Sequence, residues 1–307
     1  MASKLDCLIV GGGPAGLTAA IYLARYRRAV LVVDEAKSRC AWIPTSHNLA
    51  GFTGGIRGTD LLARIRAQAE TYGARVDIGS VTALERLPSD NGFRAALGDG
   101  RVVQAATVLL ATGVIDGQPA VPHLYDAMQR GLIRVCPICD GFEVMDQRIA
   151  VLGHGAQATG EARFIRTYSP YVTLLTLGEP MDLELDARAE LDALGIAVVE
   201  EPVVAVDTDT DIGTNRSTRL TLQSGRTLRF DTLYSALGIT ARSALAESLG
   251  ARMNDEGRLI VDRHQRTSVP GFFAAGDVVS TLNQIAVAMG EAAMAATAIH
   301  NDLRCRR

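Results

Sequence analysis

Two cysteines that could exchange electrons stand three positions apart, at Cys136 and Cys139, and Asp140 follows them directly. A C-x-x-C pair of this kind indicates either thiol–disulfide redox chemistry or a metal site. Zinc takes four ligands, commonly from two such pairs, but the sequence holds no second pair and its 5 histidines are scattered. The pair therefore favours redox chemistry, and no metal is predicted.

Two glycine-rich loops in the sequence are typical of dinucleotide binding. Gly11, Gly13 and Gly16 fit the pattern G-x-G-x-x-G, and Gly153, Gly155 and Ala158 fit G-x-G-x-x-A. The first glycine of such a loop permits a tight turn, the second lets the backbone approach a pyrophosphate, and the third lets helix and strand pack closely. The pyrophosphate then lies at the helix N-terminus, where free N–H groups and the helix dipole favour an anion.

Each loop joins a predicted strand to a predicted helix, and a second strand follows. These elements are residues 5–10, 17–25 and 29–35 for the first loop, and 148–152, 159–168 and 171–177 for the second. The first unit ends in Asp34 and Glu35, and either can accept a hydrogen bond from a ribose hydroxyl. The chain therefore repeats the dinucleotide fold, which implies two dinucleotides, or one working site and one relic. Two such cofactors can pass a hydride between them, so an enzyme is favoured over a binding module.

Three further predicted strands end in glycine. Residues 107–113 end in Ala111, Thr112 and Gly113, residues 232–238 are their counterpart in the second half, and residues 270–277 end in Gly276 and Asp277. The glycines let the chain cross close to a cofactor. Asp277, before a predicted helix over 283–301, is placed to accept from sugar hydroxyls, although a helix-capping role is the alternative.

Composition excludes several classes of protein. Apolar residues make up 48% of the 307 residues and charged residues 21%, so the chain is not mostly disordered. A net charge of -3 argues against nucleic acid as a partner. No apolar run approaches the roughly 20 residues that cross a bilayer, and no targeting segment is visible. We therefore expect a cytoplasmic protein without membrane or nucleic-acid partners.

Taken together, these segments resemble the low-molecular-weight thioredoxin reductases, which are FAD-dependent pyridine nucleotide-disulfide oxidoreductases. The segments that carry the resemblance are residues 11–16, 111–113, 136–141, 153–158 and 271–277, in that family's order and near its spacing. The resemblance implies an α/β fold with two Rossmann-like, three-layer ββα domains, the second inserted into the first. We expect an FAD-binding domain over 1–116 and 242–307, an NAD(P)-binding-like domain over 117–241, and a homodimer.

The resemblance also implies roles for individual residues. Cys139 is then the sulfur nearer the flavin, Cys136 attacks the substrate disulfide, and Asp140 donates and accepts the proton of a thiolate. Asp140 has an alternative interpretation as a turn residue beside Gly141. The residues expected to contact FAD are Gly11, Gly13, Pro14, Ala15, Gly16, Asp34, Glu35, Asn48, Ala111, Thr112, Gly113, Gly276, Asp277, Gln284 and Ile285. Gly153, Gly155 and Ala158 are the candidate contacts to NADH or NADPH.

The sequence departs from the family where NADPH would bind. NADPH-using members carry His-Arg-Arg-x-x-x-Arg after the second glycine loop, and the corresponding residues here are Thr176, Leu177, Gly178 and Asp182. A 2′-phosphate normally needs arginine forks, so NADPH is disfavoured. The electron donor therefore stays open between NADH, a ferredoxin-like or other donor, and a dithiol with O2 as acceptor. The partner is a thioredoxin-like protein or a small-molecule dithiol or disulfide, and a catalytically silent FAD module is the non-enzymatic alternative.

Overall fold

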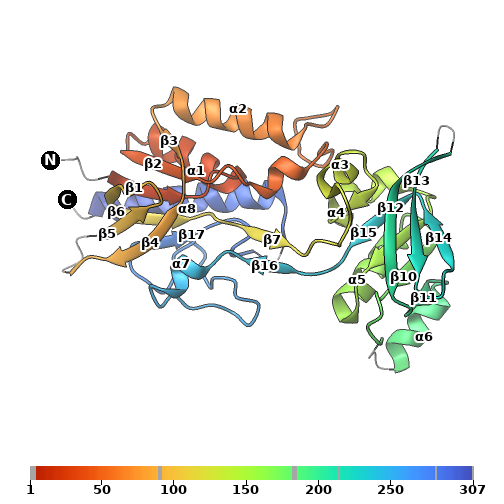
Figure 1. Cartoon of the computed structure of the whole chain (residues 1–307). Helices are drawn as coiled ribbons and strands as arrows, with labels where there is room; N and C mark the ends of the chain where they lie inside the picture. Colours follow the sequence, from red (N-terminus) through yellow and green to blue (C-terminus); the bar gives the residue numbers. More distant parts are fainter. Residues whose placement is uncertain (1–4, 89–91, 182–184, 213–214, 281, 306–307) are drawn as a thin grey trace. The chain divides into compact units, whose positions relative to one another are not determined.

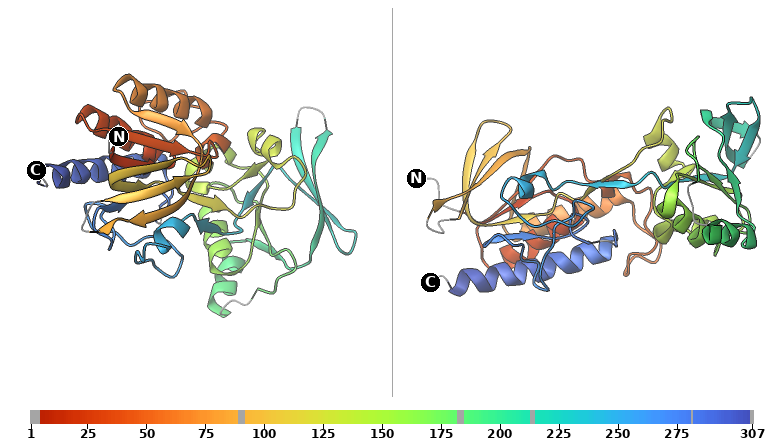
Figure 2. Two further views of the ribbon diagram at one scale, coloured as in Figure 1. Left: turned by 60° about the vertical axis from the view of Figure 1, so that its left-hand side comes forward. Right: turned by 90° about the horizontal axis from the view of Figure 1, so that it is seen from below.

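Buried, almost wholly apolar strands form the centre of each half of the molecule. The computed structural model describes residues 5–88, 92–181, 185–212, 215–280 and 282–305. The chain divides into two compact units, Met1–Ala41, Leu49–Ile115 and Thr240–Arg307 in the first, and Trp42–Asn48 and Asp116–Ile239 in the second. Figure 1 shows the elements of both units along the chain, and Figure 2 shows them from two further sides.

The first unit has three layers. Its strands are β1 (Leu5–Val10), β2 (Val30–Asp34), β3 (Arg75–Ile78), β4 (Val81–Arg86), β5 (Phe93–Leu97), β6 (Val102–Leu110) and β17 (Phe272–Ala274). Strands β3, β2, β1, β6 and β17 pair in parallel, while β4 and β5 continue from β6 as an antiparallel meander. The helices that pack on the parallel strands or on one another are α1 (Pro14–Arg25), α2 (Gly58–Thr71) and α8 (Ile285–Cys305). A short helix, α7 (Ala244–Glu247), contacts β4.

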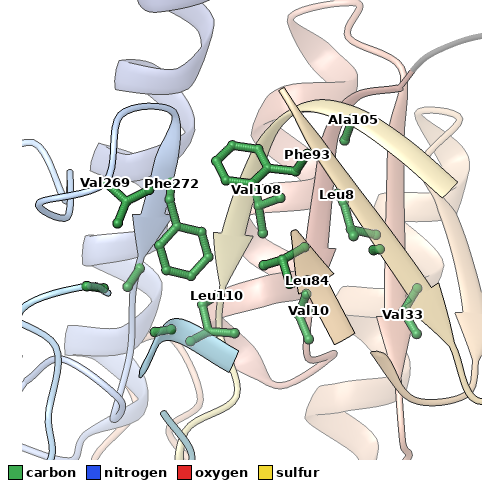
Figure 3. Close-up of a cluster of buried hydrophobic side chains, with 14 of the residues drawn as sticks. Leu8, Val10, Val33, Leu84, Phe93, Ala105, Val108, Leu110, Val269 and Phe272 are labelled. Carbon is green, nitrogen blue, oxygen red and sulfur yellow. The ribbon is translucent and has the colours of Figure 1, made fainter. Parts of the chain in front are cut away.

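Apolar side chains join the meander to the parallel strands. Leu8 and Val33 come from the parallel strands, Leu84 and Phe93 come from the meander, and Phe272 completes the cluster (Figure 3). Fully burying a Leu or Phe side chain stabilises a fold by about 1.5–3 kcal/mol. The meander is therefore part of the core of the first unit.

The second unit has a five-stranded parallel sheet in the order β11-β10-β9-β15-β8. These strands are β8 (Ile133–Arg134), β9 (Ile149–Leu152), β10 (Val172–Leu175), β11 (Ala197–Val199) and β15 (Thr232–Ser235). The unit's helices are α3 (Leu124–Gln129), α4 (Pro137–Asp140), α5 (Gly155–Ile165) and α6 (Leu185–Ala193). An antiparallel sheet of β12 (Val203–Ile212), β13 (Asn215–Leu222) and β14 (Thr227–Phe230) belongs to the same unit. The two chain crossings between the units, β7 (Val114–Asp116) and β16 (Ile239–Ala241), pair with each other.

The predicted α/β fold with two Rossmann-like units is confirmed. Both strand–loop–helix–strand repeats are present, although α1 and α5 begin three to four residues earlier than the pattern indicated, inside their glycine loops. The last helix was predicted over 283–301 and in fact runs from Ile285 to Cys305. No helix in the described part of the chain is long and apolar enough to cross a membrane.

Candidate redox site and dinucleotide-binding loops

Cys136 and Cys139 form a disulfide with a Cα–Cα distance of 5.3 Å. Cys136 has an extended backbone and precedes the single turn of α4, whose first residue is Pro137. Proline suits this position because its fixed φ matches a helix start and no backbone donor is lost there. The Cys139 amide donates to the Cys136 carbonyl at 3.0 Å, which closes the loop around the two sulfurs. The pair fits a redox disulfide.

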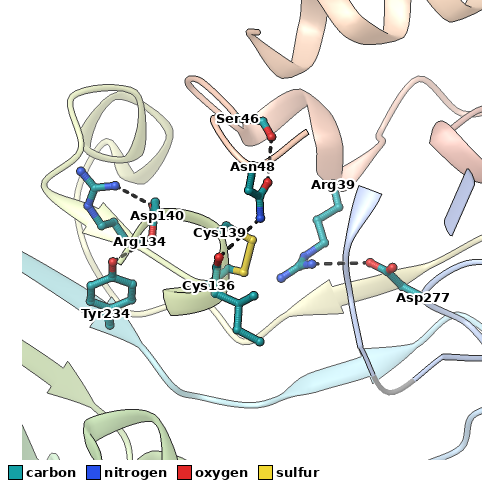
Figure 4. The surroundings of a disulfide bond; sticks show 10 residues. Arg39, Ser46, Asn48, Arg134, Cys136, Cys139, Asp140, Tyr234 and Asp277 are labelled. Carbon is teal, nitrogen blue, oxygen red and sulfur yellow. Dashed lines mark hydrogen bonds and ion pairs between the residues drawn. A yellow bond between two sulfur atoms is a disulfide. The ribbon is translucent and has the colours of Figure 1, made fainter. Parts of the chain in front are cut away.

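Asp140 is held by two side chains from separate strands of the second unit. Arg134 donates to one carboxylate oxygen at 2.6 Å, and the hydroxyl of Tyr234 donates to the other at 2.7 Å (Figure 4). Burial raises the pKa of Asp140, while the charge of Arg134 and both hydrogen bonds oppose that rise. Neither partner of Asp140 is predicted from the sequence. The available signal was an arginine two residues before Cys136 and a tyrosine within a strand that is buried throughout.

Gly141 follows Asp140 because no other residue fits there. A Cβ atom at this position would lie 2.6 Å from a ring carbon of Tyr168 and 2.7 Å from the Pro137 carbonyl oxygen. Its φ of -64° is ordinary, so close packing rather than backbone conformation requires the glycine. The Asp-Gly pair after the cysteines therefore reflects packing of α4 on the segment that holds Tyr168.

Asn48 belongs to the second unit. Asp34 and Glu35, the expected FAD contacts that precede it in the sequence, belong to the first unit. Its side-chain amide donates at 3.4 Å to the carbonyl of Ile138, between the two cysteines, and its oxygen accepts from Ser46 (Figure 4). The same segment is anchored by Gln129, which donates to the Trp42 carbonyl at 2.9 Å. Residues 42–48 thus contact the disulfide loop.

The first glycine loop forms a tight cradle at the carboxyl ends of β1, β2 and β6. Gly11 has a φ of +105°, and a Cβ there would lie 2.4 Å from the carbonyl oxygen of Ala111. A Cβ at Gly16 would lie 1.9 Å from the Gly11 carbonyl oxygen, so helix and loop pack at backbone distance. The Asp34 carboxylate accepts from the Gly12 amide at 3.1 Å, which brings the acid to the loop. Helix α1 begins directly after this loop, with Pro14 and Ala15 as its first two residues.

The strand end at Ala111, Thr112 and Gly113 lies beside this cradle. Val10 pairs with Leu110, so the residue after each strand emerges at the same edge. The Thr112 hydroxyl donates to the carbonyl of Arg242 at 2.7 Å. The Arg242 guanidinium in turn pairs with Glu35 at 2.6 Å, so Glu35 already has a cationic partner.

The segment from Gly276 to Ile285 brings the remaining expected FAD contacts to the same edge of the first unit. Ala274 pairs with Leu110, and the carboxylate of Asp277 lies 3.5 Å from Arg39. Glu291 of α8, which is not among the residues predicted from the sequence, accepts from the Gly276 amide at 2.8 Å. Gln284 accepts from Ala288 at its backbone carbonyl and stands immediately before Ile285, where α8 begins.

Arg258 is a second residue that the sequence did not reveal. Its side chain is only 4% exposed, and its guanidinium donates to the backbone carbonyls of Asp277, at 2.6 Å, and of Ser280. It also donates to the side-chain oxygen of Asn283 at 3.1 Å. A buried cation surrounded by acceptors fixes the backbone that carries Asp277.

The second glycine loop has the same construction. Gly153 has a φ of +150°, and a Cβ there would lie 2.5 Å from the carbonyl oxygen of Ala236. Gly155, with a φ of +69°, begins α5 and has open space where a Cβ would stand. Ala158 is fully buried under the loop, whereas His154 is exposed. The three expected nucleotide contacts therefore lie together at the N-terminus of α5.

The end of β10, where a 2′-phosphate would be bound, carries no basic residue from Thr176 to Glu179. Thr176 is buried, and its amide donates to the carbonyl of Val199 at 3.0 Å. Glu200 follows directly on β11 and pairs with Arg188 at 3.3 Å, so the neighbouring cation is engaged by an acid. Asp182, the last position in the compared motif, lies outside the described residues.

The remaining buried cysteines are poor nucleophiles. Burial raises the pKa of Cys7 and that of Cys40 to about 12, with the charge of Asp277 adding to the rise at Cys40. Thiols that stay protonated do not attack disulfides. Among the described residues no group of three or more His, Cys, Asp or Glu side chains is placed to hold a metal ion.

Two Rossmann-like units, one with a C-x-x-C disulfide beside its sheet, define a disulfide oxidoreductase. The model of the pyridine nucleotide-disulphide oxidoreductase family matches residues 5–292. The chain therefore belongs to that family, and it is a flavoprotein enzyme of the low-molecular-weight thioredoxin reductase class. The family implies FAD together with a pyridine nucleotide.

Individual relatives agree with this assignment. A thioredoxin reductase of Streptomyces clavuligerus is 30% identical over 310 residues, which cover 96% of this chain and 93% of that protein. A bifunctional thioredoxin reductase/thioredoxin of Mycobacterium leprae is 31% identical over 95% of this chain, but the chain spans only 64% of that longer protein. The crystal structure of thioredoxin reductase from Streptococcus pyogenes has a TM-score of 0.90 at 25% identity, covering 99% of this chain and 100% of that one.

Proposed function

We propose that the protein passes electrons from a donor through FAD to the Cys136–Cys139 disulfide, and on to the disulfide of a thioredoxin-like protein or a small molecule. The observation that carries the proposal is the disulfide itself, formed at a helix start next to a buried acid that two side chains hold. A silent flavin module would need neither the pair nor the acid.

The first unit fits an FAD domain built from both ends of the chain. The Cβ positions at Gly11 and Gly16 are filled by backbone, so only glycine leaves room for a loop that closely approaches a pyrophosphate. Helix α1 begins at Pro14 without a capping side chain, which leaves its first N–H groups to bind phosphate. Asp34 and Asp277 would accept from the sugar and ribityl hydroxyls. When bound, FAD supplies a carrier that accepts and releases two electrons.

The cysteines then act in sequence. Two electrons and a proton cleave the Cys136–Cys139 disulfide, and leave one thiol and one thiolate. The Cys136 thiolate attacks the substrate disulfide and forms a mixed disulfide, releasing the first substrate sulfur. Cys139 attacks Cys136 in that bond, re-forms the internal disulfide and releases the second sulfur, so the substrate leaves as a dithiol. Asp140 carries the proton to and from Cys139.

Exposed apolar side chains near the disulfide support a protein substrate. Ile138, between the cysteines, is 48% exposed, and Phe142 and Met145 just beyond them are 67% and 49% exposed. Large apolar groups gathered at the surface commonly mark a docking site for another protein. The Mycobacterium leprae relative, a bifunctional thioredoxin reductase/thioredoxin, joins a thioredoxin to such a reductase, which supports a thioredoxin-like partner. The family resemblance supports a homodimer, which analytical ultracentrifugation would test.

We further propose that NADH, rather than NADPH, is the nucleotide of the second unit. A 2′-phosphate carries close to two negative charges and needs cationic forks. Leu177, Gly178 and Glu179 lie just after the end of β10, and none of them is basic. Arg188 forms an ion pair with Glu200. An acid at this point suits ribose hydroxyls and repels a phosphate.

An anaerobic titration of the purified protein tests this. NADH, NADPH and dithiothreitol are added in separate runs while the visible absorption band of oxidised flavin is followed. Bleaching by NADH but not by NADPH is the expected result. If neither nucleotide bleaches the flavin while dithiothreitol does, the second site is a relic, and the enzyme is a dithiol oxidase or takes electrons from a protein donor.

A single substitution tests the reason for the preference. Leu177→Arg restores one cation and should increase the affinity for NADPH about 10- to 150-fold, because a charge-assisted hydrogen bond contributes about 1.5–3 kcal/mol. Leu177→Met is the matched control and should leave both affinities unchanged. An equal gain for NADH and NADPH would show that the 2′-phosphate does not lie at this position.

A further inference from the structure

Asp140 has no free oxygen in its present arrangement. Arg134, at the end of β8, donates to one carboxylate oxygen at 2.6 Å, and Tyr234, on β15, donates to the other at 2.7 Å. The three side chains are well shielded, with Arg134 16% and Asp140 21% exposed and Tyr234 fully buried. Two donors from two strands therefore fix both the position and the direction of this acid.

We propose that Arg134 and Tyr234 are positioning residues that set the proton affinity of Asp140 and so the pH range in which the cysteine pair exchanges electrons with the flavin. The inference deepens the proposed function and rests on it, because it takes Asp140 as the proton carrier of Cys139. Both residues act through the Asp140 carboxylate, to which each donates a hydrogen bond, and not on the sulfurs themselves.

The physical reason is a balance of opposing effects. Burial favours the neutral carboxyl, whereas a cation and a hydrogen-bond donor favour the carboxylate. Arg134 supplies the cation, Tyr234 keeps its proton because burial raises its own pKa, and both donate to the charged form. Removal of either one should therefore move the equilibrium toward the protonated acid. The guanidinium of Arg134 pairs with Asp140 through its Nη1, while its Nε is buried without a hydrogen-bond partner in the described part of the chain.

Other charges around Asp140 do not replace this pair. Glu143, in the turn after α4, adds negative charge that raises the pKa of Asp140 further. On α5, which packs against α4, Glu161 interacts with Gln157 and Arg163 pairs with Glu190. Among the described residues, Arg134 is thus the cation that Asp140 meets directly.

The test is the pH dependence of flavin reduction by dithiothreitol under anaerobic conditions, which needs no nucleotide. Electrons then pass from the Cys136–Cys139 dithiol to the flavin, and Asp140 must be ionised to accept the proton. Each rate is divided by that of Asp140→Asn at the same pH, which removes the ionisation of dithiothreitol itself. Measurements run from about pH 5 to pH 9, above the ordinary pKa of an Asp carboxyl, because burial raises the pKa of Asp140.

Arg134→Gln should move the midpoint of this profile to higher pH, slowing the reaction about tenfold on the rising limb for each pH unit of displacement. Tyr234→Phe should move it in the same direction by less, since it removes a hydrogen bond but no charge. Arg134→Lys keeps the charge and should restore part of the shift. Arg148→Gln is the matched control, because Arg148 pairs with Asp231 instead.

Titration of the Asp140 carboxyl by carbon NMR, with the signal assigned by Asp140→Asn, reports the same order independently of any rate. If Arg134→Gln and Tyr234→Phe lower the rate equally at every pH with an unmoved midpoint and an unmoved NMR titration, the proposal is wrong and the two residues are only structural. If instead Asp140→Asn leaves the pH profile of the unmodified enzyme unchanged, Asp140 carries no proton and the role assigned to it under the proposed function fails.

Discussion

The candidate redox site is built from the few residues from Cys136 to Gly141. Pro137 begins a single helical turn, and the Cys139 amide donates back to the Cys136 carbonyl. This short turn brings the two sulfurs close enough to form the disulfide. Gly141 lets the turn pack on Tyr168. The short loop therefore presents both sulfurs and the acid at one place, which two-step exchange through a mixed disulfide requires.

Replacement of either cysteine should separate the two halves of the reaction. In Cys136→Ser and in Cys139→Ser, turnover of a disulfide substrate should fall below detection, while reduction of the flavin by its donor continues. Anaerobic titration with dithionite should then consume one two-electron equivalent fewer than the unmodified protein. Cys305→Ser, at an exposed cysteine outside the pair, should consume the full amount. An unchanged equivalent count in the active-site variants would mean that the pair is not reducible.

Strand ends and helix starts position the two glycine loops. The register aligns Val10 with Val33 and with Leu110, so the residues that follow β1, β2 and β6 emerge together at one edge. Helix α1 then starts within the loop, and Gly16 lies against the backbone of Gly11. Any side chain at Gly16 must push α1 away from the loop at Gly11, which would open the proposed phosphate site.

Two helical glycines give a matched test of this geometry. In Gly16→Ala the new Cβ would stand 1.9 Å from the Gly11 carbonyl oxygen, so we expect a loss of about 1–3 kcal/mol in the free energy of unfolding and a loss of bound FAD. Gly290→Ala, in α8 with open space around it, should stabilise the protein by about 0.5–1 kcal/mol. Urea unfolding and the flavin-to-protein absorbance ratio measure both. Full FAD occupancy in Gly16→Ala would contradict the proposal that the first glycine loop binds the FAD pyrophosphate.

The whole molecule consists of two units, each with its own core. In the first unit, the cluster around Leu8 and Phe93 joins the meander to the parallel strands. In the second unit, two separate clusters cover the two faces of the five-stranded parallel sheet. A ligand that binds one folded unit stabilises that unit by mass action and leaves an independent unit unchanged. FAD should therefore act on the unit that holds the first glycine loop.

Calorimetry of the full chain tests this division. We expect two thermal transitions, of which added FAD raises one. Leu109→Ala, at a fully buried position of the first unit, should lower the transition that FAD raises, and Leu174→Ala, equally buried in the second, should lower the other. Each should cost about 2–5 kcal/mol, the usual effect of emptying a buried leucine site. A single transition that moves with both variants would show that the units unfold together.

The sequence by itself determined the two βαβ repeats, the redox pair and the glycines of both loops. These features are local: consecutive apolar residues make a strand, and a turn that approaches a backbone must lack a Cβ, so the pattern is readable from neighbouring positions. The element limits near Gly11 and Gly153 were less exact, because each helix begins within its loop.

Only the tertiary structure decided which side chains surround the chemical groups. Tyr234 reaches Asp140 across 94 residues of sequence, and Asn48 reaches the Ile138 carbonyl across 90. Glu291 and Arg258 likewise hold the backbone around Gly276 and Asp277 without any motif to mark them. Such contacts arise when packed strands and helices place distant residues together. A buried polar group must find a hydrogen-bond partner, but the packing of the elements decides which residue supplies it.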